Sequence, residues 1–176
     1  FAEELCRYYL EDHGLETRIA RFHNVMGSLG SWNGGREKAP AALCRKIASV
    51  DNNGTIEVWG SGDQARSFLH IDDCIEGILR IMQSDYSQPI NLGSDRLVSI
   101  DTLVEIIARI SGKSFSVVHN LSQPQGVRGR NSDNTLLKQV TGWVPVTSLE
   151  NGLTDTYKWI EEQVRKDNRG HGQANS

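Results

Sequence analysis

The hydrophobic positions of the chain alternate between two periods, one typical of helices and one typical of strands. From Ile100 to Ile110 apolar side chains recur at spacings of three and four, which predicts a helix with one buried face. Ser99 precedes this helix as an N-cap, and Gly112 ends it. The same spacing predicts further helices over residues 1–13, 40–50, 75–82, 136–140 and 149–164.

The helix expected at residues 75–82 follows a cluster of polar side chains. Asp72 or Asp73 would be its N-cap, and Asp73 with Glu76 forms a pair resembling a capping box. Its apolar stripe would consist of Ile75, Ile78, Leu79 and Met82. His70, Asp72 and Asp73 could also be interpreted as metal ligands. Capping explains both carboxylates, however, so we expect no metal site.

Shorter runs predict strands between these helices. They cover residues 18–25, where the alternation is imperfect, and residues 55–59, 66–71, 90–92 and 115–118. Gly60 to Ala65 fits G-x-G-x-x-A, a loose dinucleotide-binding fingerprint, but that motif must open a helix. Because the residues that follow alternate like a strand, we expect a hairpin turn there instead. The succession of strands and helices predicts an α/β fold.

Composition narrows the class of protein. The chain has 176 residues with 38% hydrophobic and 23% charged positions, as expected of a globular domain. Its net charge of −3 argues against a general nucleic-acid binder. It lacks an apolar run of membrane-spanning length and a signal peptide, and its three cysteines lack a C-x-x-C spacing. We therefore expect buried free thiols and a cytoplasmic location.

A glycine-rich loop lies between the first strand and the second helix. Lys38 ends this loop directly before Pro40, a residue favoured at the first helical position. The positive end of a helix dipole disfavours a second positive charge, and desolvation lowers a lysine pKa further. Such a lysine can act as a general acid or base, whereas a solvated loop lysine is the simpler interpretation.

Several cations lie in or beside glycine-containing loops. If the fold gathers them, they would form a local anion site on an acidic protein. They are Arg36, Lys38, Arg45, Lys46, Arg66, Arg128 and Arg130.

Particular motifs place the chain close to a known family. R-F-H-N at Arg21, R-S-F-L-H-I-D-D at Arg66 and R-x-x-D at Arg130 are typical of extended short-chain dehydrogenases/reductases. G-G-R-E-K-A-P from Gly34 and G-V-R-G-R-N-S-D-N from Gly126 are more specific. With these motifs the chain, from Phe1 to about Gln163, resembles the C-terminal half of the GDP-mannose 3,5-epimerases, within the NAD-dependent epimerase/dehydratase family.

The resemblance implies a reaction. In that family NAD oxidises C4 of a nucleotide-linked mannose, and the protons at C3 and C5 are then exchanged on both faces of the sugar, giving GDP-L-galactose or GDP-L-gulose. Lys38 matches one of the two acid/base groups. The other, a cysteine, would lie outside this chain, so Cys6, Cys44 and Cys74 are not assigned to that role.

The resemblance also implies a set of binding residues. Arg130 matches a pyrophosphate ligand, Lys46 lies near the nucleotide end, and Asn24 matches a residue that hydrogen-bonds the diphosphate-sugar. His23 matches a residue near the nicotinamide, whereas no role follows for Arg128. The remaining expected substrate contacts are Glu37, Lys38, Ala39, Gln64, Ala65 and Arg66.

The family pattern implies how the chain is divided. We expect residues 1–26 and 66–94 to be a remnant of the NAD-binding Rossmann domain, and residues 27–65 and 95–166 to form the smaller α/β substrate domain. Residues 167–176 are expected to be a disordered tail. The family's Tyr-x-x-x-Lys motif and glycine-rich phosphate loop would precede Phe1. We therefore expect a fragment that leaves most NAD contacts outside the chain and is inactive and poorly stable by itself. The parent protein is expected to be a homodimer.

Some positions depart from the family pattern. Met26-Gly27-Ser28 stands where Tyr-Gly-Pro is favoured, Asn33 where lysine is common, and Ala65 where threonine is common. These departures bear on the exact substrate more than on the reaction class. The motifs shared by extended reductases also fit a 4-epimerase, a 4,6-dehydratase or a decarboxylase, and the absence of the Tyr-x-x-x-Lys motif fits an inactive nucleotide-sugar-binding fragment. Only the 3,5-epimerase interpretation accounts for Arg36-Glu37-Lys38.

Overall fold

Strands that are distant in the sequence pair side by side in this protein. The computed structural model describes residues 1–123 and 126–173. It contains helices α1 (Ala2–His13), α2 (Ala39–Ser49), α3 (Ile71–Gln83), α4 (Ile100–Ser111), α5 (Thr135–Thr141) and α6 (Leu149–Gln173). The strands are β1 (Ala20–Phe22), β2 (Val25–Met26), β3 (Gly54–Trp59), β4 (Ala65–Arg66), β5 (Leu69–His70), β6 (Ile90–Leu92), β7 (Val98–Ser99), β8 (Phe115–Asn120) and β9 (Gly129–Arg130).

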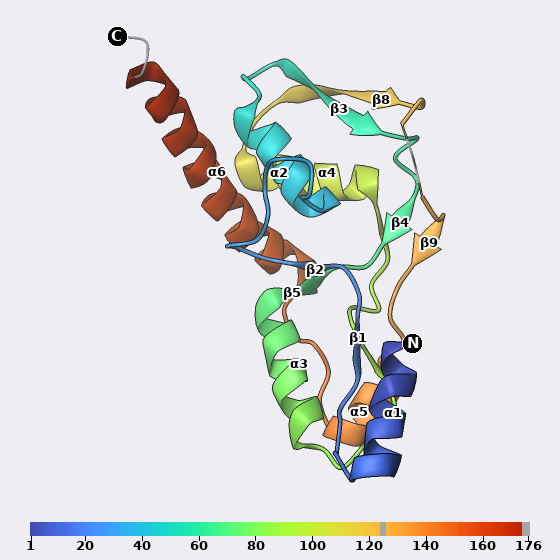
Figure 1. Ribbon diagram of the computed structural model, residues 1–176. Coiled ribbons are helices and arrows are strands. Elements are labelled where there is room, and N and C mark those ends of the chain that lie inside the picture. Colours follow the sequence, from blue (N-terminus) through green and yellow to red (C-terminus); the bar gives the residue numbers. More distant parts are fainter. Residues whose placement is uncertain (124–125, 174–176) are drawn as a thin grey trace.

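The strands form small, mostly parallel sheets. β1 pairs with β6, β2 with β5, and β3 with β8, each pair parallel. β4 lies between β7, which is antiparallel to it, and β9, which is parallel. Figure 1 shows two lobes: β3, β8, α2 and α4 lie in the upper one, and α1, α3 and α5 in the lower one. The mixture of helices and parallel strands confirms the predicted α/β class.

Each lobe has its own hydrophobic core. The upper core joins α2, α4 and α6 to β3, with Ile47, Leu103, Leu153 and Ile160 fully buried. The lower core joins α3, β6 and α5 around Ile81, Ile90, Leu92 and Leu137. α5, expected in the substrate domain, packs with the lower core, and Met26 and Phe68, expected in the Rossmann remnant, pack in the upper core, so the expected division of the chain stays a prediction.

Most predicted helix boundaries are confirmed. The Ser99 hydroxyl accepts the Thr102 N–H at 3.0 Å at the start of α4. Gly14, Gly112 and Gly142 end their helices in the left-handed conformation, which costs glycine little. The predicted end of the last helix is wrong, because α6 continues to Gln173. The Glu161–Arg165 ion pair expected on its exposed face is present at 3.0 Å, and the last three residues of the expected tail lie outside the described part.

Two predictions about local pairing are wrong. Gly60 to Ala65 opens no helix, as expected for a segment that only resembles the dinucleotide-binding motif. The expected hairpin is absent, however, because β3 pairs with β8, and β4 pairs with β7 and β9. The expected single strand at 18–25 is divided into β1 and β2. The break falls at Asn24, whose φ of 39° takes the backbone out of the strand region.

The start of α3 also differs from expectation. His70 is its N-cap, with Nδ1 accepting the Asp72 N–H at 3.4 Å. Asp73 is buried, and its Oδ2 accepts the N–H groups of Val146 at 3.1 Å and Thr147 at 2.7 Å. Neither carboxylate caps the helix, because the distant chain segment before α6 competes for Asp73.

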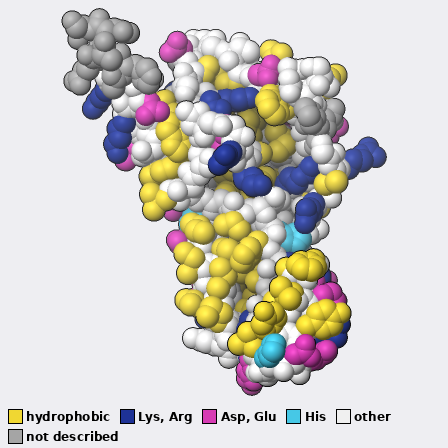
Figure 2. Space-filling view, viewed as in Figure 1, with side chains coloured by type: hydrophobic (Ala, Val, Ile, Leu, Met, Phe, Trp, Pro, Cys, Tyr) yellow, Lys and Arg dark blue, Asp and Glu magenta, His cyan; other side chains and the backbone are white. Residues whose placement is uncertain are grey.

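Three of the four residues in the apolar stripe predicted for α3 face outward, whereas Ile78 packs against the lower core. Ile75, Leu79 and Met82 are 51%, 48% and 63% exposed. The buried side contains Cys74, Gly77 and Ile81. Gly77 permits this packing, because a Cβ there would lie 2.5 Å from a methyl carbon of Leu92. Figure 2 shows hydrophobic side chains gathered over this lower lobe. In the described part of the chain, no helix combines the length and apolar character needed to cross a membrane.

Candidate functional site

The loop before α2 places Lys38 at the start of that helix, as predicted. Gly34 and Gly35 have φ values of 88° and 83°, a conformation that favours glycine. Lys38 is the N-cap in an extended conformation, and its C=O accepts the Ala42 N–H at 2.9 Å. Pro40 follows in the first turn of the helix. The Lys38 side chain is therefore attached to a backbone whose direction the helix fixes.

Lys38 lines a cavity of about 290 Å³, here called the Lys38 cavity. Arg36 shares it, together with the chain at Met26–Ser28, Ile71 of α3 and Thr156 of α6. Gly27 is required here because a Cβ would lie 2.4 Å from Cγ2 of Ile71. The cavity thus combines two cations with a wall in which the loop backbone approaches α3 closely.

A second cavity, the Lys46 cavity, has a volume of about 330 Å³ and adjoins the same helix start. Five of the predicted substrate residues line it: Glu37, Ala39, Lys46, Gln64 and Arg66. Arg45 adds a further cation, and Leu43, Val58, Trp59 and Ile100 give it apolar walls. A cavity with both characters suits a ligand that has an anionic part and a flat apolar part.

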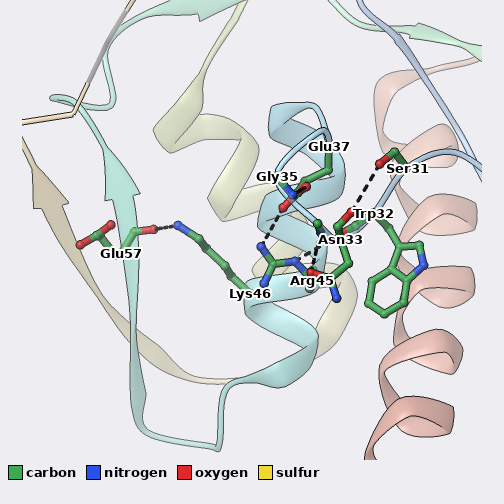
Figure 3. Close-up of polar contacts among 9 residues, drawn as sticks. Ser31, Trp32, Asn33, Gly35, Glu37, Arg45, Lys46 and Glu57 are labelled. Carbon is green, nitrogen blue, oxygen red and sulfur yellow. Dashed lines mark hydrogen bonds and ion pairs between the residues drawn. The ribbon is translucent and has the colours of Figure 1, made fainter.

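Lys46 reaches from α2 to the strand β3. Its Nζ donates to the Glu57 C=O at 2.7 Å (Figure 3). The same Nζ lies 5.7 Å from the centre of the Trp59 ring. The Trp59 Nε1–H donates to Glu57 Oε1 at 2.8 Å. Burial lowers the pKa of Lys46, against the opposing charge of Glu57. The Lys46 ammonium is therefore held within the cavity, between the helix and the strand.

Glu37 and Arg45 connect the loop to α2. The Arg45 Nη2–H donates to Glu37 Oε1 at 2.9 Å, and the Arg45 Nε–H donates to the Trp32 C=O at 3.2 Å. Glu37 Oε2 accepts the Gly35 N–H at 2.7 Å. Hydrogen bonds from its own backbone N–H, Arg45 and Gly35 lower the pKa of Glu37, against burial, which raises it. Figure 3 shows these groups converging between the loop and the helix.

The strand β4 brings two predicted phosphate ligands together. Arg66 lies opposite Arg130 of β9, and the Ala65 N–H donates to the Arg128 C=O at 2.8 Å. Ala65 itself lies in this strand and lines neither the Lys38 cavity nor the Lys46 cavity. The pairing confirms that some of the predicted cations gather at one place.

His23 and Asn24 lie at the break between β1 and β2. Nδ1 of His23 is buried and has no hydrogen-bond partner within residues 1–123 and 126–173. Burial lowers the pKa of His23, and the charge of Arg130 lowers it further. The Asn24 Nδ2–H donates to the Ser67 C=O at 3.0 Å, which fixes its side chain beside β5.

A larger cavity of about 670 Å³ lies elsewhere and contains none of the predicted site residues. It lies where α3, α5 and α6 begin, and Asp73 is part of its wall. No group of three His, Cys, Asp or Glu residues in the described ranges could hold a metal ion.

Two cations are important for α2 in ways that the sequence did not indicate, although Arg45 was among the residues expected at an anion site. One is Arg45, described above. The other is Lys113, whose Nζ donates to the C=O groups of Ile47, Ala48 and Val50 at 3.0, 2.6 and 2.8 Å. The sequence signal for Arg45 was its spacing from Glu37, about two helical turns, which could have indicated an ion pair. The second contact joins residues too far apart for any spacing rule.

Comparison with known proteins agrees with the family resemblance that the sequence motifs indicate. "GDP-mannose 3,5-epimerase 1" of Oryza sativa subsp. japonica is 50% identical over 165 residues, covering 94% of this chain and 43% of that protein. The Arabidopsis thaliana GDP-mannose 3,5-epimerase is 49% identical, also over 94% of this chain and 43% of its own length. The chain therefore spans less than half the length of these curated relatives.

Solved structures share the fold. UDP-glucose 4-epimerase of Thermotoga maritima matches with a TM-score of 0.82 and 23% identity, covering 92% of this chain and 51% of that one. UDP-glucuronic acid 4-epimerase of Bacillus cereus, solved with UDP-glucuronic acid and NAD, matches with a TM-score of 0.78 and 25% identity, covering 92% and 50%. The model of the "NAD dependent epimerase/dehydratase family" matches residues 1–93, more than half of the chain. The chain belongs to the NAD dependent epimerase/dehydratase family.

Proposed function

We propose that this chain is the C-terminal part of an NAD-dependent nucleotide-sugar epimerase that converts GDP-mannose by inversion at C3 and C5. The observation that carries the proposal is the position of Lys38 at the start of α2, where one loop lines both the Lys38 cavity and the cation-lined Lys46 cavity. The 50% identity to the rice GDP-mannose 3,5-epimerase supports this choice of substrate.

Lys38 is proposed as an acid/base catalyst. When bound, NAD supplies the reversible oxidation of the sugar at C4, which makes the neighbouring C–H groups acidic. The Lys38 Nζ takes a proton from one face of the sugar or returns one to it. Inversion needs a second group on the opposite face, and neither Cys44 nor Cys74 suits that role, since burial raises the pKa of both.

The nucleoside diphosphate is proposed to lie along the Lys46 cavity. Arg66 and Arg130, opposite each other on β4 and β9, would bind the pyrophosphate, because a guanidinium can donate two hydrogen bonds to a phosphate. Lys46 and Gln64 would lie at the nucleotide end, and Asn24 near the sugar. Ala39 and Ala65 complete the proposed substrate residues, whereas the Glu37 carboxylate is already bonded to Arg45 and Gly35.

His23 is proposed as the contact of this chain with NAD. Its buried Nδ1 without a described partner fits a polar group that meets a ligand, because buried polar atoms are normally hydrogen-bonded. Most of the cofactor site would belong to the part of the relatives that this chain does not cover.

A homodimer and a cytoplasmic location are also proposed. α1 contains no buried residue and exposes Leu5, Tyr8 and Tyr9, as expected of a helix that packs against another part of the assembly. The cysteines are all free thiols, and two of them are buried, which suits a reducing compartment.

Deuterium exchange in a chimera tests the proposal. The chain would be joined behind the N-terminal part of the rice relative and incubated with GDP-mannose and NAD in D₂O. We expect deuterium at C3 and C5 of the sugar. Lys38→Met should reduce incorporation by about 10²- to 10⁴-fold, the usual contribution of a positioned acid/base group. Lys158→Met, on an exposed face of α6, is the matched control and should leave incorporation unchanged.

Two results would count against the proposal. Full incorporation in the Lys38→Met chimera would remove Lys38 from the reaction. Inversion at C4 without deuterium at C3 or C5 would identify a 4-epimerase instead, which has no need of Lys38.

A further inference from the structure

Arg45 has no place in the proposed chemistry, yet it organises the residues before Lys38. It lies in the second turn of α2, and its guanidinium points back towards the loop (Figure 3). Arg45, Glu37, Gly35 and Trp32 are here called the Arg45 clasp. Its hydrogen bonds are the three described above, between 2.7 and 3.2 Å long.

The clasp uses two of the three nitrogens of the planar guanidinium. Nε–H is directed at the Trp32 C=O and Nη2–H at Glu37. A lysine has one nitrogen at the end of a flexible chain and cannot make both contacts in this fixed geometry. The Trp32 side chain packs against the upper core, so the clasp connects a loop anchored on that core to the start of α2.

The Glu37 carboxylate is occupied within the protein. Its side chain is only 7% exposed, one oxygen accepts from Arg45 and the other from Gly35. The positive φ values of Gly34 and Gly35 turn the loop so that the Gly35 N–H meets this oxygen. Glu37 is therefore better suited to holding the loop than to contacting a ligand through its carboxylate.

The clasp ends at the residue next to Lys38. Lys38 is held on its other side by the bond from the Ala42 N–H to its C=O. Among the described residues, the Lys38 ammonium itself has neither a hydrogen bond nor an ion pair. The backbone, which the clasp and α2 fix together, consequently sets the point and direction from which the Lys38 side chain leaves the loop.

We propose that Arg45 and Glu37 are positioning residues for Lys38, acting through the loop backbone and not through contact with the substrate. This inference rests on the proposed function for its catalytic part. A displacement of about 1 Å can reduce a rate by about 10²-fold, so loss of the clasp should lower kcat by about 10- to 100-fold. KM for GDP-mannose should change by less than about threefold, because the ligand contacts remain.

The test uses the same chimera with Arg45→Lys, Glu37→Gln and the double variant. Arg45→Lys keeps the positive charge in the Lys46 cavity, so any effect comes from the lost fork and not from lost attraction for phosphate. Arg165→Lys is the matched control, because Arg165 also pairs with a glutamate but is 65% exposed on α6. Backbone hydrogen exchange at residues 33–38 is measured on every variant, beside kcat and KM.

The expected result is faster exchange at residues 33–38 and lower kcat in both single variants, with a double variant no worse than the more impaired single one. Unchanged exchange in Arg45→Lys would overturn the clasp. Faster exchange with unchanged kcat would overturn the positioning role, and a raised KM at constant kcat would make Arg45 a ligand contact. If the unmodified chimera catalyses no epimerisation, the proposed function fails, and the catalytic part of the inference fails with it. The exchange data then still decide whether the clasp exists.

Discussion

Replacing Asp73 by alanine should destabilise the protein strongly, whereas the same change at its neighbour Asp72 should not. Asp73 is 5% exposed, and its Oδ2 alone receives the N–H groups of Val146 and Thr147. The Asp72 side chain is 81% exposed. The two residues are adjacent and chemically identical, so each controls for the other.

The magnitude follows from the two hydrogen bonds. A hydrogen bond to a charged group contributes about 1.5–3 kcal/mol, and a buried donor left without an acceptor is costly, so two such bonds give a loss of about 3–6 kcal/mol for Asp73→Ala. Asp73→Asn keeps one carbonyl oxygen that can accept both bonds and loses only the charge. Its loss should be smaller, about 1–2 kcal/mol. Asp72→Ala should stay within about 0.5 kcal/mol of the unmodified chimera.

Urea unfolding of the chimera described above, followed by circular dichroism, measures these free energies and those predicted below, because the chain alone is expected to lack a cooperative transition. The reasoning requires the order Asp73→Ala, then Asp73→Asn, then Asp72→Ala in decreasing loss. If Asp73→Ala differs from Asp72→Ala by less than 1 kcal/mol, the contact between α3 and the segment before α6 is not a source of stability, and the reasoning is wrong.

Three other predictions follow from separate contacts. Lys113→Met should lower the unfolding free energy by about 2–3 kcal/mol, because three carbonyls at the end of α2 lose their charged donor; an equal loss in Lys158→Met would contradict this. The Arg96–Glu150 ion pair, with the hydrogen bond from Arg96 as the largest cause, lowers the pKa of Glu150 from 4.5 to about 2. Its contribution is therefore fully present above about pH 4.5 and lost as the pH falls through about 2. The unfolding free energies of the unmodified chimera and Arg96→Met should differ by at most about 1 kcal/mol near pH 6 and converge towards pH 2, since both side chains are nearly half exposed. The chain alone should bind a hydrophobic dye such as ANS and lack a cooperative thermal transition at about 45–65 °C, because α1, β1 and α3 expose large apolar side chains; such a transition would refute the expected poor stability.

The features that the sequence predicted well are local ones. Helix α4 follows from its own apolar spacing, from Ser99 as N-cap and from Gly112 at its end, all within a short stretch of chain. The same holds for Lys38 before Pro40, since the loop and the helix start are contiguous. Local rules describe these positions because no distant segment competes for the groups involved.

The wrong predictions share one cause, which is a contact with a distant segment of the chain. Asp73 satisfies the rules for a helix cap, but the backbone at Val146 and Thr147 takes its carboxylate. The expected hairpin after β3 fails because β8, not β4, supplies the partner strand. Most of the stripe of α3 faces outward because Gly77 lets the other face approach Leu92. Each outcome depends on residues distant in the sequence, which no spacing rule includes.

The strand pairing described above has a consequence for how the chain folds. Ala20 lies opposite Ile90, Gly54 opposite Phe115, and Ala65 opposite Gly129, so each parallel pair must close a long loop before it gains any contact. During synthesis β1 leaves the ribosome well before its partner β6, and β3 well before β8. Such non-local pairing makes folding slow and leaves strand edges unpaired for that time, when aggregation competes with folding. Production at low temperature or with chaperones should therefore raise the yield of folded chain more than stabilising any single helix.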